Sequence, residues 1–568
     1  MHVAKDTEQI EQPNPWGLDA ALVEQLRSEV QEVVAAEKDL DEVKVILARR
    51  KGEWDKATQP QAGALVTALD VDTALADIEY GDAVLTTLMF RDRYCHDNSL
   101  EKTYRWAGTY WTEDTNRQAE ADMREVAEEH RKRARDWKEK ANQEADKNKK
   151  AALEKSCEAH KGRARQILTR TKANTIFKLA TAGDGSLGVS GKEWEREPTL
   201  LACANGVIEL ETGRLVPGRP EQYLRKASPM EYHGMHVAAP FWEETLLKLF
   251  CRDLEVIDYI ELVIGYASTG LMSFKDFYCC HGPGGDNGKS FLFDTIRWVL
   301  GEYAGTVPTS IILEDWGKGG GSGPNPDLLK LNGMRLCVFP EAKKNARFSM
   351  DTIKYLTGSD TISVRGLYQR DPIEFTPSAK PFLHTNWIPK VQGNDPAFFK
   401  RLRIIPFLAK FVLPGGKVQI APEQHIYEAV PPEKLREMLL AEAPGILAWI
   451  VRCAHRFLAT MDLTPPDKVL AAGEDYQQGQ DMIGQWIDQC CDVSDKQREE
   501  QTKDLYASFC KWLQDEQGID EPKKFIGLRS FGEDMQQRFE RRKTNVVYYR
   551  GVRIRDDWRP EGPKQGEM

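Results

Sequence analysis

The sequence predicts an α/β core, with a mixed α+β region before it and a winged-helix-like region after it. Three observations predict this organisation. An apolar run, Phe277–Cys280, leads into the glycine-rich loop Gly282–Ser290 and then into a helical pattern. Two later apolar runs each end in a polar side chain, Glu341 and Asn386. Beyond residue 520 the pattern is helix followed by two short strands, and this order is typical of a winged helix.

Length and composition limit the classes of protein that fit. A chain of 568 residues exceeds one hydrophobic core and predicts two to four domains. Its net charge of −10 argues against a generally basic nucleic-acid coat but leaves room for a local basic patch. The eleven cysteines lack CxxC spacing, so we expect free thiols. No stretch approaches 18 apolar residues and no signal core begins the chain, so we expect neither a membrane span nor secretion.

The first 240 residues alternate between helical and strand patterns. Residues 18–56 have apolar side chains at helical spacing and predict a packing helix, with an interaction helix as the alternative. Aromatic residues at 104–111 predict short strands around a turn. Residues 113–172 are highly charged without a heptad stripe, which favours a solvated helical hairpin over a coiled coil. From Leu200 an alternating pattern broken by glycines predicts a β-hairpin.

The loop after the first core strand has the setting of a phosphate-binding loop. Its glycines let backbone N–H groups turn toward phosphates, Lys289 would neutralise the β- and γ-phosphates, and Ser290 would hold Mg²⁺ at the helix N-terminus. The GxxxxGK[ST] pattern needs glycine where this chain has Pro283, so the loop carries one extra residue, for which Asp286 is the candidate. The predicted phosphate-binding residues are Gly284, Gly285, Asp286, Asn287, Gly288, Lys289 and Ser290.

Two polar residues at strand ends complete the predicted site. Glu341 follows the apolar strand in MRLCVFPEA and could polarise the attacking water and support the metal together with Ser290. Asn386 ends the strand in KPFLHTN and could sense the γ-phosphate and orient water. Each also has an ordinary explanation, as an acid or an amide at the end of a strand.

Basic residues between and after these strands suggest further roles. Arg401, or Arg403 as the fallback, precedes an apolar strand at a position that suits an arginine finger acting on a neighbouring subunit. Two strand-like runs flank a segment containing Arg365, Tyr368 and Arg370, which predicts a hairpin whose aromatic and cationic side chains contact DNA. The alternative for this segment is an ordinary exposed hairpin.

The ordered motifs resemble those of the superfamily III helicases found in phage and plasmid primase-helicases and in the poxvirus primase-helicase. The motifs are NGVIEL, TGRL, VIGYASTG, GDNGKS, PDLLKLNGMRLCVFPE, IKYLTGSDTISVRGLY, IEFTP, HTNWIP and KRLRIIPF, and they cover about residues 80–420. The resemblance implies an AAA+-type phosphate-loop ATPase that forms a hexameric ring around DNA and translocates with ATP and Mg²⁺. By position, Lys289 and Ser290 match the Walker A pair, Glu341 the Walker B acid, Asn386 the sensor and Arg401 the finger.

The chain departs from the family pattern at two places. Its phosphate loop is one residue longer than the usual GxxGNGKS, and its Walker B strand offers only Glu341, preceded by Pro340, where many relatives have two acids. Both departures concern the rate of hydrolysis more than the fold. They keep open an ATP-switched origin-binding or helicase-loading protein with little turnover, and a DNA-packaging motor is a second alternative.

With the resemblance, the expected domains are an accessory helical region at 1–79, a helicase-associated domain at 80–239, the motor at 240–425, and a helical and winged-helix-like DNA-binding region at 426–568. The expected protein is a replicative DNA helicase of a phage, virus or plasmid-like element, acting in the cytoplasm of the host. Its expected partners are DNA, further copies of itself and a separate primase or polymerase.

The two ends of the chain raise separate questions. Asp70-Val-Asp72 resembles the metal pair of an attached primase only superficially, because no strand pattern precedes it, so we expect the primase to be separate or absent. Residues 521–555 contain ten Lys or Arg and four Asp or Glu. A helix at Ser530–Glu540, the basic run Arg541, Arg542 and Lys543, and strands at Asn545–Tyr549 and Val552–Arg555 predict a DNA-binding winged helix, with a packing module as the alternative.

Overall fold

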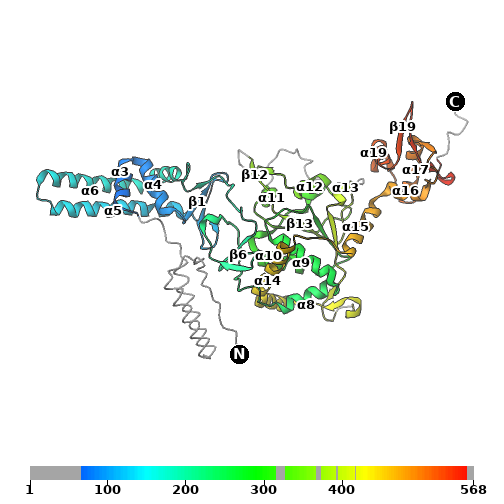
Figure 1. The fold of residues 1–568 in the computed structure, drawn as a ribbon, viewed down its shortest axis with the longest axis horizontal. Coiled ribbons are helices and arrows are strands. Elements are labelled where there is room, and N and C mark those ends of the chain that lie inside the picture. Colours follow the sequence, from blue (N-terminus) through cyan, green and yellow to red (C-terminus); the bar gives the residue numbers. More distant parts are fainter. Residues whose placement is uncertain (1–65, 315–325, 366–371, 392–394, 416–417, 560–568) are drawn as a thin grey trace, which may run out of the picture.

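The computed structural model describes residues 66–314, 326–365, 372–391, 395–415 and 418–559. It is elongated, with a helical hairpin at one end, a sheet-containing body in the middle and a small C-terminal module at the other end (Figure 1). The helix predicted at 18–56 lies outside the described residues, as do Tyr368 and Arg370.

The N-terminal part is a helical hairpin joined to a small sheet. Its helices are α3 (Ala68–Ala76), α4 (Ile78–Phe90), α5 (Gln118–Gln143), α6 (Lys147–Ile167) and α7 (Arg170–Ala180). Its strands are β1 (Tyr94–Asp97), β2 (Lys102–Trp106), β3 (Trp111–Glu113) and β4 (Gly188–Val189), in the order β3-β2-β1-β4. The hairpin of α5 and α6 and the aromatic strands around a turn are therefore confirmed.

Polar side chains lie between the helices of the hairpin beside its apolar core, and we call Asp72, Asp82, His130, Arg133 and His160 the hairpin network. The two histidines meet through their Nδ1 atoms at 3.0 Å, and the Nε2 of His130 lies 3.1 Å from Asp82. The Nε2 of His160 lies 3.1 Å from Asp72, to which the Nε of Arg133 also donates at 2.7 Å. The dense charges of residues 113–172 predicted a hairpin whose polar side chains face solvent. In the structure, the side chains of the hairpin network instead pair with one another between the helices.

A metal pair at Asp70 and Asp72 is excluded by the local structure. Both lie in helix α3 and not on a strand. Asp70 forms a capping box with Thr67, which stabilises the first turn, while Asp72 points to Arg133. The two carboxylates therefore serve different structural purposes.

A three-stranded antiparallel sheet connects the N-terminal part to the body. It consists of β5 (Leu200–Cys203), β6 (Gly206–Glu209) and β7 (Arg214–Val216), so the predicted β-hairpin has one strand more than expected. The buried guanidinium of Arg335 donates to the carbonyl oxygens of Leu200 (2.5 Å) and Ser268 (2.9 Å). These bonds join the small sheet to the body without leaving a buried charge unsatisfied.

The body is built on five parallel strands in the order β14-β8-β13-β10-β9. Their bounds are β8 (Phe277–His281), β9 (Ala304–Thr306), β10 (Leu336–Phe339), β13 (Lys380–Thr385) and β14 (Leu402–Pro406). The three apolar runs predicted as core strands are thus β8, β10 and β13. The protein is a mixed α/β structure with a parallel sheet.

Helices and short elements cover both faces of this sheet. Along β8, Tyr278 and Cys280 join one core cluster while Phe277 and Cys279 join the other, as the alternation of a strand requires. The first face packs against α8 (Pro240–Leu249), α9 (Leu254–Ser268), α10 (Lys289–Leu300) and α14 (Pro432–Thr460). The second packs against α11 (Pro326–Leu329), α12 (Met350–Leu356), α13 (Pro396–Phe399) and the hairpin of β11 (Ile362–Val364) and β12 (Ile373–Phe375).

Further short elements complete the body. A parallel pair, β15 (Lys410–Val412) and β16 (Ile426–Glu428), follows the sheet, and α15 (Asp467–Gln480) contacts its β14 edge. Single 3₁₀ turns lie at η1 (Pro220–Gln222), η2 (Gly301–Tyr303), η3 (Thr309–Ile312), η4 (Pro422–Gln424) and η5 (Asp556–Trp558). Among the described residues, α14 alone is long and apolar enough to cross a membrane by length and composition, and 56% of its most apolar window is buried inside the protein.

The C-terminal module surrounds its own core of Trp486, Phe509, Trp512 and Phe531. Its elements are α16 (Met482–Cys490), β17 (Cys491–Asp492), β18 (Glu499–Gln501), α17 (Thr502–Asp515), α18 (Pro522–Phe525), α19 (Leu528–Arg538), β19 (Glu540–Lys543), β20 (Val547–Arg550) and β21 (Arg553–Ile554). The predicted helix begins and ends two residues earlier than expected.

The strand pairing in this module differs from the prediction. We expected the runs 545–549 and 552–555 to pair, but β20 lies between β18 and β19, while β21 pairs with β17. The missed strand β19 contains the basic run itself, and its four exposed charged residues carry no alternating apolar signal. All eleven cysteines are free, as predicted.

Candidate functional site

The glycine-rich loop follows β8 directly and ends where α10 begins. Gly284, Asp286 and Gly288 have φ values of +75°, +64° and +76°, so the loop turns back on itself before the helix. Gly282 is required by close packing, since a Cβ there would lie 2.5 Å from the Phe407 carbonyl oxygen. The loop therefore brings backbone N–H groups to the N-terminus of α10, a site that attracts anions.

The extra loop residue predicted at Asp286 has a defined position. Its carbonyl oxygen accepts a hydrogen bond of 2.8 Å from the Phe411 N–H of β15. The neighbouring Asn287 is buried and donates to the Ala409 carbonyl oxygen at 3.0 Å. The longer loop is thus fastened to the segment after β14, and the side chain of Asn287 serves this anchorage.

Lys289 lies at the centre of the polar groups. Its Nζ donates to the Asn386 Oδ1 (2.8 Å), the Asn287 Oδ1 (3.1 Å) and the Gly282 carbonyl oxygen (3.3 Å). Burial lowers the pKa of Lys289, and the nearby Glu341 carboxylate partly offsets this effect. All three hydrogen-bond acceptors are uncharged, so an anion that entered the site would be the stronger partner for the ammonium group.

Glu341 and Asn386 come together because their strands are neighbours. β13 lies between β8 and β10, so the residues after these three strands meet at one edge of the sheet. The Asn386 N–H lies 3.3 Å from the Glu341 Oε1. The structure therefore brings Lys289, Glu341 and Asn386 into one cluster at the carboxyl ends of parallel strands, where ligands of open α/β sheets bind.

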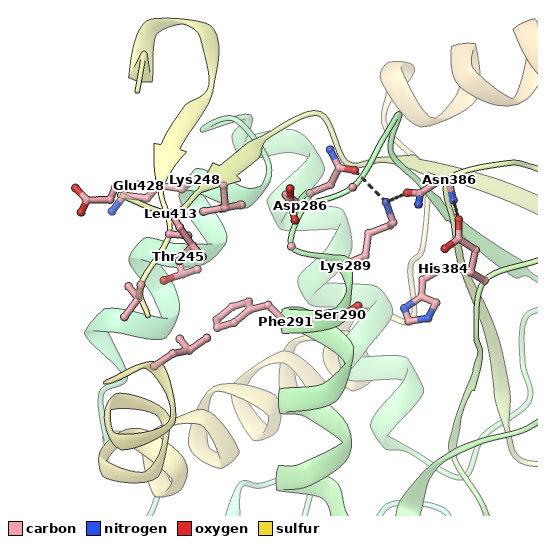
Figure 2. Close-up of a pocket in the computed structure, with 18 of the residues that line it drawn as sticks. Thr245, Lys248, Asp286, Lys289, Ser290, Phe291, His384, Asn386, Leu413 and Glu428 are labelled. Carbon is pink, nitrogen blue, oxygen red and sulfur yellow. Dashed lines mark hydrogen bonds between the residues drawn. The ribbon is translucent and has the colours of Figure 1, made fainter. Parts of the chain in front are cut away.

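A cavity of about 440 Å³ extends from this cluster. Lys289, Ser290, Glu341, His384 and Asn386 line its polar end. The other end is lined by apolar side chains together with Thr245, Lys248 and Glu428, and the apolar ones are Phe241, Phe291, Phe411, Leu413, Val430 and Leu435. Figure 2 shows Lys289, His384 and Asn386 to one side of the loop and Thr245, Phe291 and Leu413 to the other.

The surroundings of two histidines near the polar end lower the pKa of each ring. Burial lowers the pKa of His281 and of His384, and the positive charge of Lys289 lowers both further. Lys289 thus remains the cation at this end of the cavity.

The metal prediction names two oxygen ligands, and both line the cavity. The Ser290 hydroxyl lies in the first turn of α10, and Glu341 lies across from it on the β10 side. Among the described residues, no group of three or more His, Cys, Asp or Glu side chains could hold a metal ion by itself. Mg²⁺ suits such a site, since it usually takes one or two protein oxygens together with substrate phosphates and water.

The two candidate finger arginines lie away from this cavity. Arg401 immediately precedes β14, while the glycine-rich loop follows the parallel strand β8, so the two lie at opposite ends of the sheet. Arg401 donates to the Ala397 carbonyl oxygen (2.7 Å), and among the described residues it forms no ion pair. Arg403 instead forms an ion pair of 3.0 Å with the buried Asp276.

The predicted DNA contacts lie on exposed elements. Arg365 directly follows β11 and is exposed, while the rest of the tip lies outside the described residues. Arg541, Arg542 and Lys543 are all exposed on β19, and Arg542 forms an ion pair of 3.0 Å with Glu499. The cavity residues and these basic residues are therefore separate parts of the surface.

The apolar end of the cavity was not predicted from the sequence. Phe241 comes from α8, Phe291 from α10 and Phe411 from β15, and these segments are far apart along the chain. Their aromatic side chains have no common spacing that would mark them as one site. The order of motifs could indicate the phosphate end alone.

Comparisons with known proteins agree with the motif series. The family described as "D5 N terminal like" matches residues 83–251. A "putative helicase" of Acanthamoeba polyphaga mimivirus is 26% identical over 321 residues, covering 55% of this chain and 33% of that protein. A "putative helicase" of Frog virus 3 is 28% identical over 384 residues, covering 56% of this chain and 39% of that protein. A "putative primase" of African swine fever virus is 24% identical over 222 residues, covering 38% of this chain and 23% of that protein.

Among solved structures, the C-terminal region of NrS-1 is 12% identical with a TM-score of 0.32, covering 62% of this chain and 95% of that one. The chain spans about a third of the length of the viral helicase relatives that it matches. Over part of its length the chain is therefore similar to D5-like viral primase-helicases, in agreement with the resemblance that its motifs predicted.

Proposed function

We propose that this chain is the motor subunit of a viral-type replicative DNA helicase, binding and hydrolysing ATP in the cavity beside Lys289. The observation that carries the proposal is the meeting of Lys289, Glu341 and Asn386 at the carboxyl ends of adjacent parallel strands. An AAA+-type phosphate-loop core accounts for that arrangement. The viral relatives support a role in DNA replication.

The two ends of the cavity match the two ends of a nucleotide. The loop and the N-terminus of α10 offer N–H donors and the Lys289 cation to phosphates. The aromatic side chains of Phe291 and Phe411 offer apolar surface to a base and ribose. Ser290 and Glu341 would hold Mg²⁺, which when bound supplies charge neutralisation for the phosphates.

Hydrolysis then depends on rearranged hydrogen bonds. Lys289 exchanges its neutral partner Asn386 for a phosphate oxygen, a stronger charge-assisted acceptor. The released Asn386 amide can orient a water molecule. Glu341 accepts that water's proton as its oxygen bonds to the γ-phosphorus, and the bond from the γ-phosphorus to the β-phosphate oxygen breaks to release ADP. The contact between Asn386 and Glu341 keeps the two groups close enough to share one water.

The position of Arg401 supports assembly of several copies of the chain into a ring. It lies at the opposite end of the sheet from its own loop, so it could reach an ATP phosphate only on a neighbouring copy of the chain. Repetition of this head-to-tail contact closes a ring, which we propose to be a hexamer around DNA. Arg403 is engaged by Asp276 and is the weaker candidate.

DNA contacts are proposed at two places. The hairpin of β11 and β12, with Arg365 beside its tip, would face the strand that passes through the ring. In the C-terminal module, α19 and the basic strand β19 would act as the recognition helix and wing of a winged helix. A primase or polymerase would act as a separate partner in the same replication process.

An ATP-switched loader remains the rival function, favoured by the position of Asp286. This inserted carboxylate lines the cavity beside the proposed phosphate site, and a loop altered in this way would slow hydrolysis, which a nucleotide used only as an assembly switch tolerates. A packaging motor has weaker support, because the viral relatives are named as putative helicases and primases.

DNA-stimulated ATP hydrolysis and fork unwinding test the proposal. We expect Lys289→Ala and Arg401→Ala each to lose at least about 10³-fold in hydrolysis, the effect typical of an arginine finger. Mixing the two inactive variants should restore part of the rate, since about a quarter of the interfaces in an equal mixture pair an intact Lys289 with an intact Arg401. Arg403→Ala in the same mixture tests the fallback arginine.

The outcomes separate the candidates. Full hydrolysis by Lys289→Ala would contradict the site. Tight ATP binding by the wild type without turnover, in the presence of DNA, would support the loader. Inactive variants that stay inactive when mixed would contradict the role of Arg401 in a neighbouring site.

A further inference from the structure

Beside the cavity, two short segments form a basic platform, which we define as Lys343, Lys344, Trp387 and Lys390. The segments follow β10 and β13 and lie side by side. The Lys390 N–H donates to the Ala346 carbonyl oxygen at 2.8 Å, and the Phe348 N–H donates to the Lys390 carbonyl oxygen at 2.9 Å. These bonds hold the two segments beside each other, so neither is an independent loop.

Trp387 is the most unusual member because a large aromatic ring is 52% exposed. The Lys344 Nζ lies over this ring, 4.6 Å from its centroid. Thr385 fixes the backbone, since its Oγ1 accepts from the Trp387 N–H at 3.1 Å and donates to the Trp387 carbonyl oxygen at 2.8 Å. The ring is therefore positioned by its neighbours while remaining accessible.

The platform carries unbalanced positive charge. Lys343, Lys344 and Lys390 are all exposed, and within the described ranges none of them forms an ion pair. The whole chain has a net charge of −10, so three such lysines on two adjoining segments, one of them over the Trp387 ring, are a local exception. A polyanion that also has flat apolar faces satisfies both features of this surface.

We propose that the basic platform binds single-stranded nucleic acid, with a base stacked on Trp387 and phosphates held by Lys344 and Lys390. This inference rests on the proposed function and adds a second strand contact beyond the hairpin of β11 and β12. An unpaired strand fits better than a duplex, because only unpaired bases offer their faces for stacking.

The platform is joined to the nucleotide site by the chain itself. Trp387 directly follows Asn386, and Lys343 lies two residues after Glu341. A strand that shifts Trp387 would move the backbone that carries Asn386, whose Oδ1 bonds to Lys289. The contact therefore couples strand binding to the groups proposed to sense ATP.

Fluorescence anisotropy with two oligonucleotides of equal length tests this inference, one of thymidine residues and one of abasic residues. We expect Trp387→Ala to weaken binding of the thymidine oligonucleotide about tenfold, with no change for the abasic one. Trp387→Phe should retain most of the affinity. Lys344→Ala combined with Lys390→Ala should weaken binding of both and reduce the salt slope by about 1.4.

A control is Trp137→Ala on the distant helical hairpin. Lys140 lies over the Trp137 ring at 4.8 Å, as Lys344 lies over Trp387, but Trp137 is half-buried and its Nε1 donates to Asp72 at 3.2 Å, so its fold must be checked by the same melting measurement. We expect this control to bind both oligonucleotides like the wild type. Circular dichroism melting should show that the Trp387 variants remain folded, because the ring that they lose is exposed.

Three outcomes would overturn the inference, and the last of them would also contradict the proposed function. If Trp387→Ala and the wild type bind the thymidine oligonucleotide with equal affinity, the proposed role of the platform is contradicted, while the proposed function is unaffected. A smaller assembly mass for Trp387→Ala in light scattering assigns the platform to contacts between copies of the chain and not to nucleic acid. Failure of the wild type to bind either oligonucleotide contradicts DNA as the partner, and with it the proposed function.

Discussion

The helical hairpin and the nucleotide cavity both contain charged groups, but they satisfy them in different ways. In the hairpin network, each carboxylate has a partner on another helix, such as Asp72 with Arg133 at an Nε–Oδ1 distance of 2.7 Å. In the cavity, Lys289 bonds only to neutral oxygens, and Glu341 contacts only a backbone N–H within the described residues. In the hairpin, the charged side chains pair with one another. In the cavity, Lys289 and Glu341 have no charged hydrogen-bond partner among the described residues and remain available to a ligand.

This difference separates groups that stabilise the fold from groups that can do chemistry. A buried charge with matched partners resists removal, because the partner left behind would be desolvated without compensation. A charged group whose partners are neutral forms stronger hydrogen bonds when it binds an oppositely charged ligand instead. We therefore expect substitutions in the hairpin to change stability and substitutions in the cavity to change activity.

The largest expected effect is on turnover, from Glu341→Gln. Loss of the general base should lower ATP hydrolysis by about 10²- to 10⁴-fold, while ATP binding and the melting temperature stay close to the wild type. Steady-state hydrolysis and equilibrium nucleotide binding, measured on the same preparation, separate the two. Glu314→Gln, an acid outside the cavity, is the control. Loss of folding in Glu341→Gln would break the distinction between the two regions.

The second effect is on stability, from Asp82→Ala in the hairpin. Asp82 is fully buried and pairs with His130 (3.1 Å) and Arg163 (3.3 Å), so its removal strands a buried guanidinium and should cost about 3 kcal/mol. Hydrogen exchange of α5 and α6 amides reports this local free energy of opening. Glu158→Ala removes an exposed pair with Lys161 on α6 and should cost far less than Asp82→Ala, because solvent screens an exposed pair. Equal costs for the two variants would contradict a buried network.

A smaller effect is expected from pH. Burial lowers the pKa of His160 in the folded protein, and the adjacent His130 lowers it further. The unfolded chain then binds the proton more readily, so the contribution to stability is present above about pH 6.5, the ordinary pKa of histidine, and is lost as pH falls below it. Exchange rates of α5 and α6 amides at pH 7.5 and 5.5, corrected for intrinsic chemistry, measure the change.

The control for this pH effect is His160→Gln, which removes the titrating ring. We expect its hairpin stability to depend less on pH than that of the wild type. A wild-type hairpin that became more stable on acidification would reverse the sign and contradict a neutral His160.

The sequence predicted the strands around the cavity because they are short apolar runs bounded by glycines or polar residues. β8, β10 and β13 are completely buried or nearly so, and such strands have a local signature. The segment with Asp70 and Asp72 had no such signature, since TALDVDTAL fits a strand or a helix until Thr67 caps it. The predicted domain limits and catalytic roles stay predictions.

What the sequence could not provide depends on contacts between distant segments. The hairpin network looked like solvated charge because each of its residues is spaced as on a surface helix, and only the packing of α5 against α6 and α4 makes it an interior. The apolar end of the cavity likewise joins α8 to β15. The platform around Trp387 depends on two backbone bonds between segments about 40 residues apart.

The smallest expected effect comes from the inserted loop residue, through Asp286→Asn. The carboxylate lines the cavity at the predicted phosphate position, where its negative charge opposes that of ATP. Removing one exposed like-charge contact is worth about 0.5–1 kcal/mol, so ATP affinity should rise about two- to fivefold. The amide preserves side-chain size, and the 2.8 Å bond from Phe411 to the Asp286 carbonyl oxygen involves the backbone alone, so loop geometry is retained.

Equilibrium ATP binding at low and high salt is the measurement, because a charge effect must shrink as salt rises. Unchanged affinity would mean that the carboxylate points away from bound phosphate, and the longer loop would then be only an attachment to β15. A gain in affinity that persists at high salt would point to altered loop geometry and not to charge.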